Sequence, residues 1–355
     1  MRLVCYKAMC GDAFHLQYEG ESGKFRNIFL DMGHPKTYTH ILRTVISRLV
    51  GASEQIDALF LSHIHDDHIG GACRFIKDIQ KDVTFENVVG RWIYNAPRKY
   101  DIVHTSDNKN GVLCGIVSGD KVYEHILANC PSDLNDVIAG HSFNLDGMKV
   151  SILSPDVDRL KQLRDKYSNK RPLCKSETDE ISVEEGGVVD DYSIPLSQFK
   201  TDNFQEDTNI ENASSIAAIL EYRGKRILWL SDSIPSVIVS SLSKLGFSET
   251  NRMQCEAVLL SHHGSAANNS LELFKMISAN KYIFSADGIN RHCLPNKVTV
   301  ARIVAASSKV PVSLYFNYCD GRLLRMFKSD ILDSLEAMID VHYLKDGEAI
   351  DFSDN

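Results

Sequence analysis

Short apolar runs alternate with polar breaks along the first half of the chain, a pattern typical of strands separated by turns. Residues 37–50 differ, because Ile41, Val45 and Leu49 recur on one face at helical spacing. A second helix is expected from about Gly70, after the run at 56–61. The runs that we expect to form strands are 3–6, 13–18, 27–31, 56–61, 89–94 and 148–153.

The second half repeats this alternation and adds a hairpin signal. Residues 215–222 and 225–230 are both strand-like, and Arg223-Gly224 between them is a tight-turn pair. The other expected elements are helices over 158–166, 235–245, 270–277 and 297–306 and strands over 257–260, 281–285, 311–317 and 322–327. Two β-rich stretches with flanking helices predict a layered α/β architecture.

Residues 168–208 interrupt this order, because they are polar and acidic and show no apolar period. At about 150 residues per domain, a chain of 355 residues has room for about two domains. We instead expect one domain over 1–330, enlarged by a loop-rich insertion at about 156–210. Residues 331–355 are expected to form an acidic tail or a peripheral helix.

Composition narrows the class of protein. The net charge of −8 excludes a wholly basic surface that coats nucleic acid, although a local basic groove remains open. The nine cysteines are irregularly spaced and contain no C-x-x-C pair, which favours reduced thiols in a cytoplasmic protein. No apolar run approaches the ~20 residues that span a bilayer, so no membrane association is expected.

The strongest chemical signal follows the strand expected at 56–61. The motif His63-x-His65-x-Asp67-His68 places three imidazoles and a carboxylate within six residues. Imidazole nitrogen and carboxylate oxygen suit zinc and similar ions. In an extended segment His63 and His65 point to the same side and can share one ion, while Asp67 and His68 on a helical turn would face a second. A polar loop with accidental histidines is the alternative, and the density of the motif disfavours it.

Two further signals also follow apolar strands. One imidazole of the pair His262-His263 can complete a metal shell, and the other can donate a proton or stabilise an anion. Asp232 can bridge two ions, or can cap the helix expected from 235. Asp12 and Asp31 also end apolar runs, and for them turn and hydrogen-bonding roles are the simpler interpretation.

These motifs resemble the signature of the metallo-β-lactamase fold superfamily. The resemblance narrows to the branch that contains the metal-dependent domain of ComEC-like DNA-uptake proteins, because His262-His263-Gly264-Ser265 is similar to a mark of that branch. The first motif, followed by Gly70-Gly71, carries the resemblance at the level of the fold. The weaker matches are Gly11-Asp12-Ala13-Phe14, 28–33, 212–216 and 282–288.

The resemblance implies a four-layer αββα sandwich with two divalent ions, Zn²⁺ or Mn²⁺, at one end of the two sheets. Asp232 would bridge the two ions. We expect His263 to face the substrate as a catalytic residue and Asp67 to orient a hydroxide. The residues that the resemblance implies as metal ligands are His63, His65, Asp67, His68, Asp232 and His262.

Three more residues are candidates for the site. Related enzymes carry another histidine ligand between the first motif and the bridging aspartate, and here His104, His125 and His141 lie in that interval. His141, in an Ala-Gly-His-Ser segment, resembles such a ligand, although the ComEC-like branch has a non-ligand polar residue there. His292 stands near the expected closing segment, and Asn212 begins an Asn-x-Ser-Ser segment of the same branch.

Two ions about 3.5–4 Å apart suit hydrolysis of a phosphodiester by a metal-bound hydroxide. We therefore expect a phosphodiesterase or nuclease whose substrate carries phosphate, with DNA or a nucleotide as candidates. Arg91, Arg98 and Lys99 could meet phosphates, although solvated or structural roles are the simpler interpretation. The alternatives are a lactonase, thioesterase or β-lactamase-like carboxyl hydrolase, or a metal-binding regulatory or scaffold protein whose insertion docks a partner.

Overall fold

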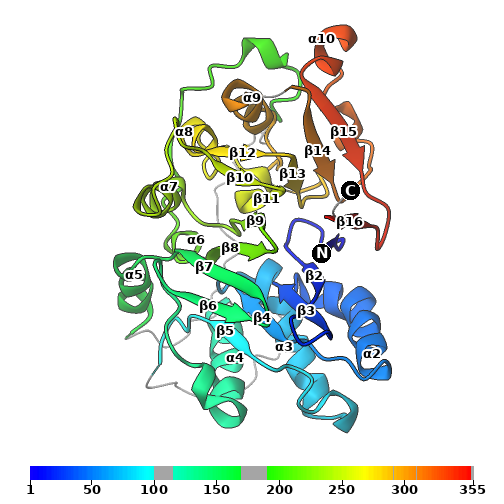
Figure 1. Cartoon of the computed structure of the whole chain (residues 1–355), viewed down its shortest axis with the longest axis vertical. Helices are drawn as coiled ribbons and strands as arrows, with labels where there is room; N and C mark the ends of the chain where they lie inside the picture. Colours follow the sequence, from blue (N-terminus) through cyan, green and yellow to red (C-terminus); the bar gives the residue numbers. More distant parts are fainter. Residues whose placement is uncertain (100–114, 169–189, 291, 309, 353–355) are drawn as a thin grey trace, which may run out of the picture.

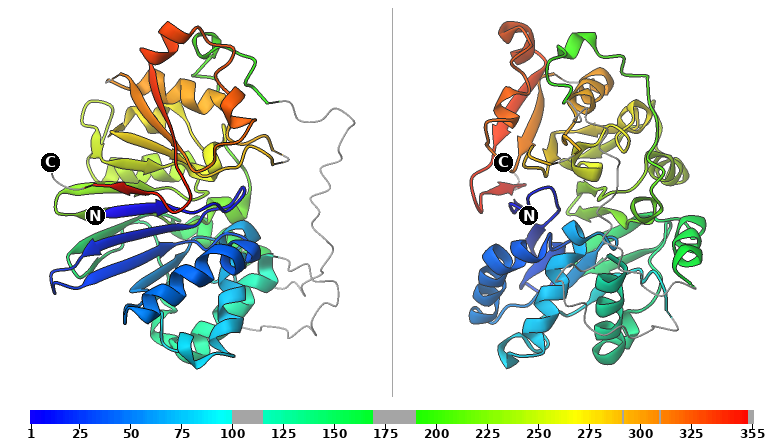
Figure 2. Two further views of the ribbon diagram at one scale, coloured as in Figure 1. Left: turned by 90° about the vertical axis from the view of Figure 1, so that its right-hand side faces the viewer. Right: turned by 180° about the vertical axis from the view of Figure 1, so that it is seen from behind.

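The computed structural model describes residues 1–99, 115–168, 190–290, 292–308 and 310–352. Two large sheets face one another, and helices cover the outer face of each (Figures 1 and 2). The six strands of the first sheet are, in spatial order, β16 (Ala349–Asp351), β1 (Arg2–Cys5), β2 (Phe14–Glu19), β3 (Phe25–Leu30), β4 (Ala58–Leu61) and β5 (Trp92–Tyr94).

The second sheet is larger and comes mostly from the second half of the chain. Its strands are β15 (Ile339–Tyr343), β14 (Val312–Phe316), β13 (Lys281–Phe284), β11 (Ala257–Leu259), β9 (Lys225–Trp229), β8 (Ala217–Tyr222), β7 (Met148–Ser154) and β6 (Ser142–Leu145). Strands β8 and β9 form the expected antiparallel hairpin. A separate parallel pair joins β10 (Met253–Cys255) to β12 (Ile277–Ala279).

The helices fall into two groups that cover opposite faces. Beside the first sheet lie α1 (Pro35–Thr37), a π-helical turn at Tyr38–Leu42, α2 (Arg43–Gly51), α3 (Asp66–Ile79), α4 (Gly115–Asn129) and α5 (Val157–Tyr167). The second sheet carries α7 (Pro235–Lys244), α8 (Leu271–Lys275) and α9 (Lys297–Ala306). The short helix α6 (Ile210–Ala213) has three buried residues, whereas the short helix α10 (Leu332–Glu336) has none.

Three apolar cores separate the four layers. In β4, Leu59 and Leu61 point to the core under α2 and α3, while Phe60 points to the core between the sheets. In β9, Leu228 faces the helices of the second sheet and Trp229 faces the first sheet. Because side chains alternate along a strand, strands with both faces buried read as continuous apolar runs. The predicted α/β class and layered αββα sandwich are confirmed.

The strand ends that matter for the site meet at one end of the sandwich. Strands β3 and β4 are parallel in the first sheet, and β9, β11 and β13 are parallel in the second. Carboxyl ends of parallel strands lie along the same sheet edge, so the segments after these strands converge. Each chemical motif singled out from the sequence follows one of these strands.

The structure differs from the sequence-based elements in three places. Residues 322–327 were expected as a strand, but Leu323–Arg325 form a 3₁₀ turn whose first N–H groups are accepted by Asp320. Its apolar residues Leu323 and Met326 fill the core beside β14, a spacing of three that suits a helical turn. Helix α3 begins at Asp66 rather than near Gly70, so Asp67 and His68 lie on a helical turn, as the first motif predicted. The polar residues of this turn do not contribute to the apolar pattern from which the helix start was predicted.

The segment 331–355, expected as a tail or a peripheral helix, carries strands after α10. Strand β15 pairs in parallel with β14, and β16 pairs antiparallel with β1, so the segment extends an edge of both sheets. The N–H of Phe352, the last described residue, consequently donates to the carbonyl of Met1 at 2.8 Å. These strands depend on edges made by distant residues, which explains why their own short sequences do not announce them. No helix within the described ranges is long and apolar enough to cross a membrane.

Candidate metal centre

The first motif lies in the turn between β4 and α3. His63 directly follows the strand, His65 is the N-cap of the helix, and Asp67 and His68 lie in its first turn. This turn packs closely on the loop after β1, where a Cβ on Gly11 would stand 2.2 Å from the carbonyl oxygen of Asp67. Glycine is therefore required there, and the close approach brings the next residue, Asp12, to the site.

Asp232, after β9, is the centre of the cluster. Its Oδ2 lies 3.7 Å from Nε2 of His63 and 3.7 Å from Nε2 of His262. Its Oδ1 lies 3.3 Å from Nε2 of His68 and 4.0 Å from Nε2 of His263. The carboxylate is therefore shared between two pairs of imidazoles, one pair for each oxygen.

Asp67 and His65 complete the two sides of this carboxylate. Asp67 Oδ2 lies 3.4 Å from Nε2 of His263 and 3.8 Å from Nε2 of His68, so it belongs to the Oδ1 side. The ring of His65 stands 4.7 Å from that of His63, the histidine that faces Oδ2. The structure thus brings together all six residues that were expected as metal ligands, and His263 with them.

The Nδ1 atoms of His63 and His68 converge on Asp31. His68 Nδ1 donates to Asp31 Oδ2 at 2.8 Å. His63 Nδ1 donates to the Ser62 hydroxyl at 3.0 Å, and that hydroxyl donates to Asp31 Oδ2 at 2.7 Å. These bonds place both Nε2 atoms toward Asp232, as is usual for histidines that bind a metal through Nε2. Asp31 thus has the expected hydrogen-bonding role, and it acts on the site.

The His262-His263 pair points to two different sides because its backbone is left-handed at both residues, with φ of 46° and 55°. His263 Nδ1 donates to the Ser285 carbonyl at 3.1 Å and lies 3.3 Å from Asp12 Oδ1. His262 Nδ1 donates to Asn268 Oδ1 at 2.9 Å. Such φ values are uncommon for residues other than glycine, and here they direct both Nε2 atoms to Asp232.

The donor atoms at the centre fit a cation. Nε2 of His63, His68 and His263 and Oδ1 of Asp232 are buried and have no hydrogen-bond partner among the described residues. Buried polar atoms are rarely left unpaired, and four that face one another are the arrangement expected of metal ligands. Two overlapping groups have metal-ligand spacing, His63–His68–Asp232 and Asp12–His68–His263.

The pKa shifts of the buried histidines reflect the negative charge of the carboxylates around His68 and His263. Burial lowers the pKa of His63, and the nearby His68 lowers it further. Burial also acts to lower the pKa of His68 and His263, but the carboxylates around them, Asp232 foremost, raise both pKa values well above the ordinary value. A divalent cation would supply the countercharge that protons on these two rings provide in its absence.

The three additional candidate residues, His141, His292 and Asn212, are not all near the cluster. His141 is exposed at the start of β6, and His292 is exposed in a turn, outside the metal-spaced groups found among the described residues. Asn212 is buried, and its Nδ2 lies 3.5 Å from Nδ1 of His262. His104 lies outside the described residues, and His125 packs edge-on against Trp92 away from the cluster.

The basic residues considered for phosphate contacts are engaged elsewhere. Arg98 is buried and ion-paired with Asp120. Lys99 pairs with Asp136 at 2.6 Å. Arg91 lies over the ring of Phe143, with its guanidinium carbon 4.3 Å from the ring centre. The structural interpretation of these cations is therefore the one that the contacts favour.

Sequence reasoning missed the site roles of Asp12 and Asp207, which lie beside Nδ1 of His263 and His262. Asp12 carried a usable signal, because a buried acid next to a glycine at a loop suggests a close approach. For Asp207, within the polar segment before α6, we find no signal in the sequence.

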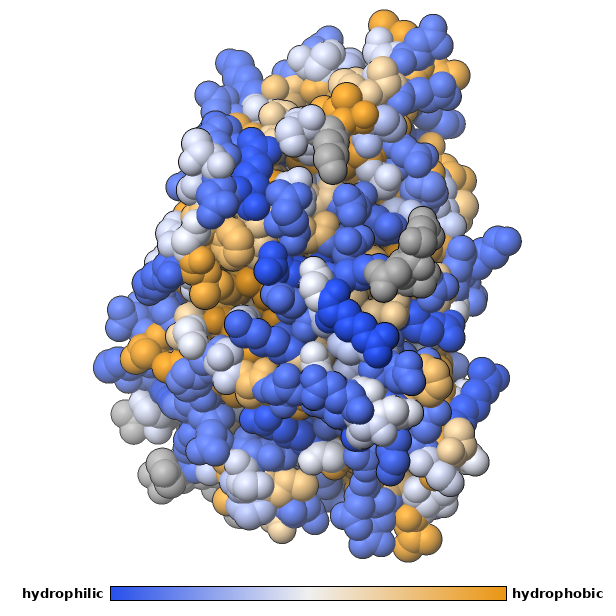
Figure 3. All heavy atoms as spheres, in the orientation of Figure 1, coloured by the Kyte–Doolittle hydropathy of each residue, from blue (hydrophilic) through white to orange (hydrophobic). Residues whose placement is uncertain are grey.

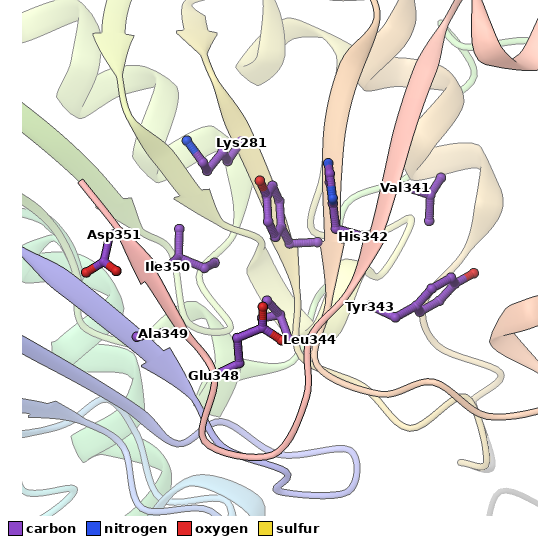
Figure 4. A pocket seen from close by; sticks show the side chains of 10 residues that line it. Lys281, Val341, His342, Tyr343, Leu344, Glu348, Ala349, Ile350 and Asp351 are labelled. Carbon is purple, nitrogen blue, oxygen red and sulfur yellow. The ribbon is translucent and has the colours of Figure 1, made fainter. Parts of the chain in front are cut away.

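A hollow of about 470 Å³ lies away from this cluster, between the inner face of β13–β15 and strand β16 (Figure 4). The ring of Tyr315 stacks on that of His342 at 4.5 Å, and Lys281 and Glu348 border them. None of its lining residues belongs to the histidine cluster, so this hollow is not the metal centre.

Comparisons with known proteins match one segment of the chain to a family model and find solved structures of low similarity. A family model described as the metallo-beta-lactamase superfamily matches residues 26–92, which include the first motif. No curated protein matches the chain. The metallo-beta-lactamase fold protein YhfI from Bacillus subtilis is similar over 98% of both chains, at 10% identity and a TM-score of 0.42. Zn(2+)-bound PqqB from Methylobacterium extorquens is similar over 99% of this chain and 100% of its own, at 11% identity and 0.43.

A third structure, the long form RNase Z from yeast, covers 81% of this chain and 37% of its own at 12% identity and a TM-score of 0.35. At such identities and TM-scores these likenesses support no statement about function. The family model covers the segment from β3 to β5 of the observed sandwich. The metallo-beta-lactamase superfamily model thus matches one segment of this layered α/β structure, and that segment contains the first motif.

Proposed function

We propose that the protein is a metal-dependent hydrolase that holds two divalent cations, with phosphodiesters as the favoured substrate class. The observation that carries this proposal is the sharing of Asp232, whose two oxygens each face two imidazole nitrogens. Two cations bound there would polarise a substrate oxygen and activate a water at neutral pH. Zn²⁺ and Mn²⁺ both suit imidazole and carboxylate donors.

The ligand sets follow from the two oxygens of Asp232. The residues of the first set are His63, His65 and His262 on the Oδ2 side. The residues of the second set are Asp67, His68 and His263 on the Oδ1 side. This proposal gives His263 a ligand's position, where the sequence had suggested a substrate-facing one, because its ring is only 2% exposed. His262 then supplies the third imidazole that the first set otherwise lacks.

The unequal exposure of these groups indicates where substrate would approach. His63, His68 and Asp232 are almost fully buried, whereas the side chains of Asp67 and His262 are 23% and 26% exposed. His65 is also half-buried. The buried groups exclude water from behind, and Asp67 and His65 meet the incoming water and ester. Asp67 would therefore bind and also orient the attacking oxygen.

The contacts of the basic residues favour a small phosphodiester or nucleotide over a long nucleic acid. Affinity for a nucleic-acid backbone depends on several free lysines and arginines. Arg98 and Lys99 are held by Asp120 and Asp136, so they do not serve that purpose. The same fact supports a second candidate, a lactone or carboxyl-ester hydrolase, whose substrate needs no basic rim. A metal-free scaffold is disfavoured by the four unpaired donor atoms.

A substrate panel tests this proposal. The purified protein is incubated with bis-p-nitrophenyl phosphate, single-stranded DNA and a set of lactones, each with Mn²⁺, Zn²⁺ or a chelator. We expect metal-dependent hydrolysis of the phosphodiester, lost in His65→Ala and kept in the control Asp340→Asn, which alters an exposed residue far from the site. Hydrolysis of lactones alone would favour the second candidate, and no turnover with any metal would contradict both.

A further inference from the structure

Asp207 approaches the metal centre from the end of the polar segment between α5 and α6. Its Oδ2 lies 3.7 Å from Nδ1 of His262, and its side chain is 15% exposed. Among the expected ligands, His262 is the one whose own side chain lies both at the surface and on a left-handed backbone. It therefore needs support that the buried histidines obtain from their surroundings.

Asp207 supplies that support through two amides. Asn212 Nδ2 donates to Asp207 Oδ2 at 2.8 Å, and Asn268 Nδ2 donates to the same oxygen at 3.2 Å. Asn268 Nδ2 also donates to the carbonyl of Asp232 at 3.2 Å. Because both acceptors lie on the nitrogen side of this amide, its oxygen is turned to Nδ1 of His262.

This arrangement selects one tautomer of His262. With Asn268 Oδ1 accepting at 2.9 Å and a carboxylate behind it, the proton stays on Nδ1. Nε2 then carries no proton, and its lone pair is free to bind a cation. It lies 3.7 Å from the Asp232 oxygen that His63 also faces. His263 obtains the same result from the main chain, through the Ser285 carbonyl. Polar partners of this kind fix the ring and the tautomer of a metal-binding histidine.

The segment that carries Asp207 is held in place independently of His262. The main-chain N–H of Asp207 donates to the Ala267 carbonyl at 3.1 Å. The preceding Glu206 accepts two bonds from Ser236 in the first turn of α7, at 2.7 and 2.8 Å. Glu206 anchors the segment without contacting the histidine, so it offers a matched control.

We propose that Asp207 is a positioning residue. Through Asn268 it orients His262 as a ligand of the cation on the Oδ2 side of Asp232. This inference rests on the proposed two-cation centre. It assigns a role in the site to Asp207, which places a carboxylate behind a ligand from the described end of the polar segment. Replacing a polar partner behind a metal ligand costs ~10–100-fold in metal affinity.

The test compares Asp207→Ala with Glu206→Ala and the wild-type chain. Titration of the metal-free proteins with Zn²⁺ in a calorimeter gives the number and affinity of bound ions. Selective ¹⁵N labelling of histidine and NMR of the metal-free proteins gives the tautomer of His262, assigned with His262→Gln. Thermal unfolding of the metal-free proteins checks that each variant folds.

We expect Asp207→Ala to weaken one of two Zn²⁺ steps by ~10–100-fold and to shift His262 from its Nδ1–H tautomer. Glu206→Ala should keep both affinities and the tautomer, and Asp207→Asn should show a smaller loss because one acceptor oxygen remains. Unchanged tautomer and affinity in Asp207→Ala would overturn the inference, and so would an equal loss in Glu206→Ala. A wild-type chain that binds neither Zn²⁺ nor Mn²⁺ in the same titration would instead overturn the proposed function, and the inference with it.

Discussion

The two sides of the metal centre use the same kinds of side chain but support them differently. On the Oδ1 side of Asp232, carboxylates stand directly behind the imidazoles, Asp31 behind His68 and Asp12 behind His263. On the Oδ2 side the direct partners are neutral, the Ser62 hydroxyl for His63 and the Asn268 amide for His262. There the carboxylates stand one hydrogen bond further back.

This difference changes how strongly each side holds a positive charge. The pKa of His63 is lowered by burial, whereas carboxylates keep the pKa values of His68 and His263 well above normal despite burial. A negative charge next to an imidazole raises its basicity, and a neutral partner mainly orients the ring. We infer that the Oδ1 side binds cations more tightly and that the Oδ2 side exchanges more readily.

Removing the carboxylate of Asp232 should weaken metal binding on both sides at once and should have the largest effect on metal content and activity. In Asp232→Asn both sides lose the oxygen charge that their Nε2 atoms face. We expect loss of both bound ions and a fall in activity beyond the ~10–100-fold typical of residues behind the ligands. Metal analysis after dialysis checks this result. One ion retained at full affinity would show that Asp232 is not shared.

Asp31→Asn should weaken the two sides unequally. Asn tolerates the positive φ of 58° at this position, so the backbone can stay as it is. His68 loses a charged partner in direct contact, while His63 is affected only through Ser62. We expect ~10–100-fold weaker binding at the Oδ1 side and a smaller loss at the other. Stepwise calorimetric titration measures both, and equal losses would contradict the asymmetry.

How far the sequence predicts this asymmetry depends on distance along the chain. The first motif lies within one turn, so its ligands and their position after β4 could be predicted from local spacing. Whether His262 and His263 face Oδ2 or Oδ1 of Asp232 depends on the left-handed backbone at both residues, and no pattern of side chains predicts such a backbone. The fold follows the same rule, because β4 and β9 read as apolar runs while β15 and β16 need edges built by residues far away.

Binding of metal should release protons from His68 and His263 on the Oδ1 side of Asp232. At pH 7 the raised pKa values leave His68 and His263 protonated in the metal-free protein, while the lowered pKa of His63 leaves it neutral. A cation must displace the protons of the first two, so affinity at the Oδ1 side rises with pH, about tenfold per unit for each proton displaced. Calorimetry in buffers of different ionisation enthalpy measures the release. Proton release at neither step would contradict the pKa directions.

Asp12→Asn should give the smallest change in metal affinity. It measures how much of the tighter binding on the Oδ1 side comes from the charge behind His263. Asp12 Oδ1 is 3.3 Å from Nδ1 of His263, but that nitrogen also donates to the Ser285 carbonyl at 3.1 Å. The ring therefore keeps its orientation when the charge is removed, and only its basicity falls. We expect about tenfold weaker binding at this side, near the lower end of effects behind ligands, and no change at the other. A loss as large as that of Asp31→Asn would mean that orientation, rather than charge, depends on Asp12, and that the main-chain carbonyl alone does not hold His263.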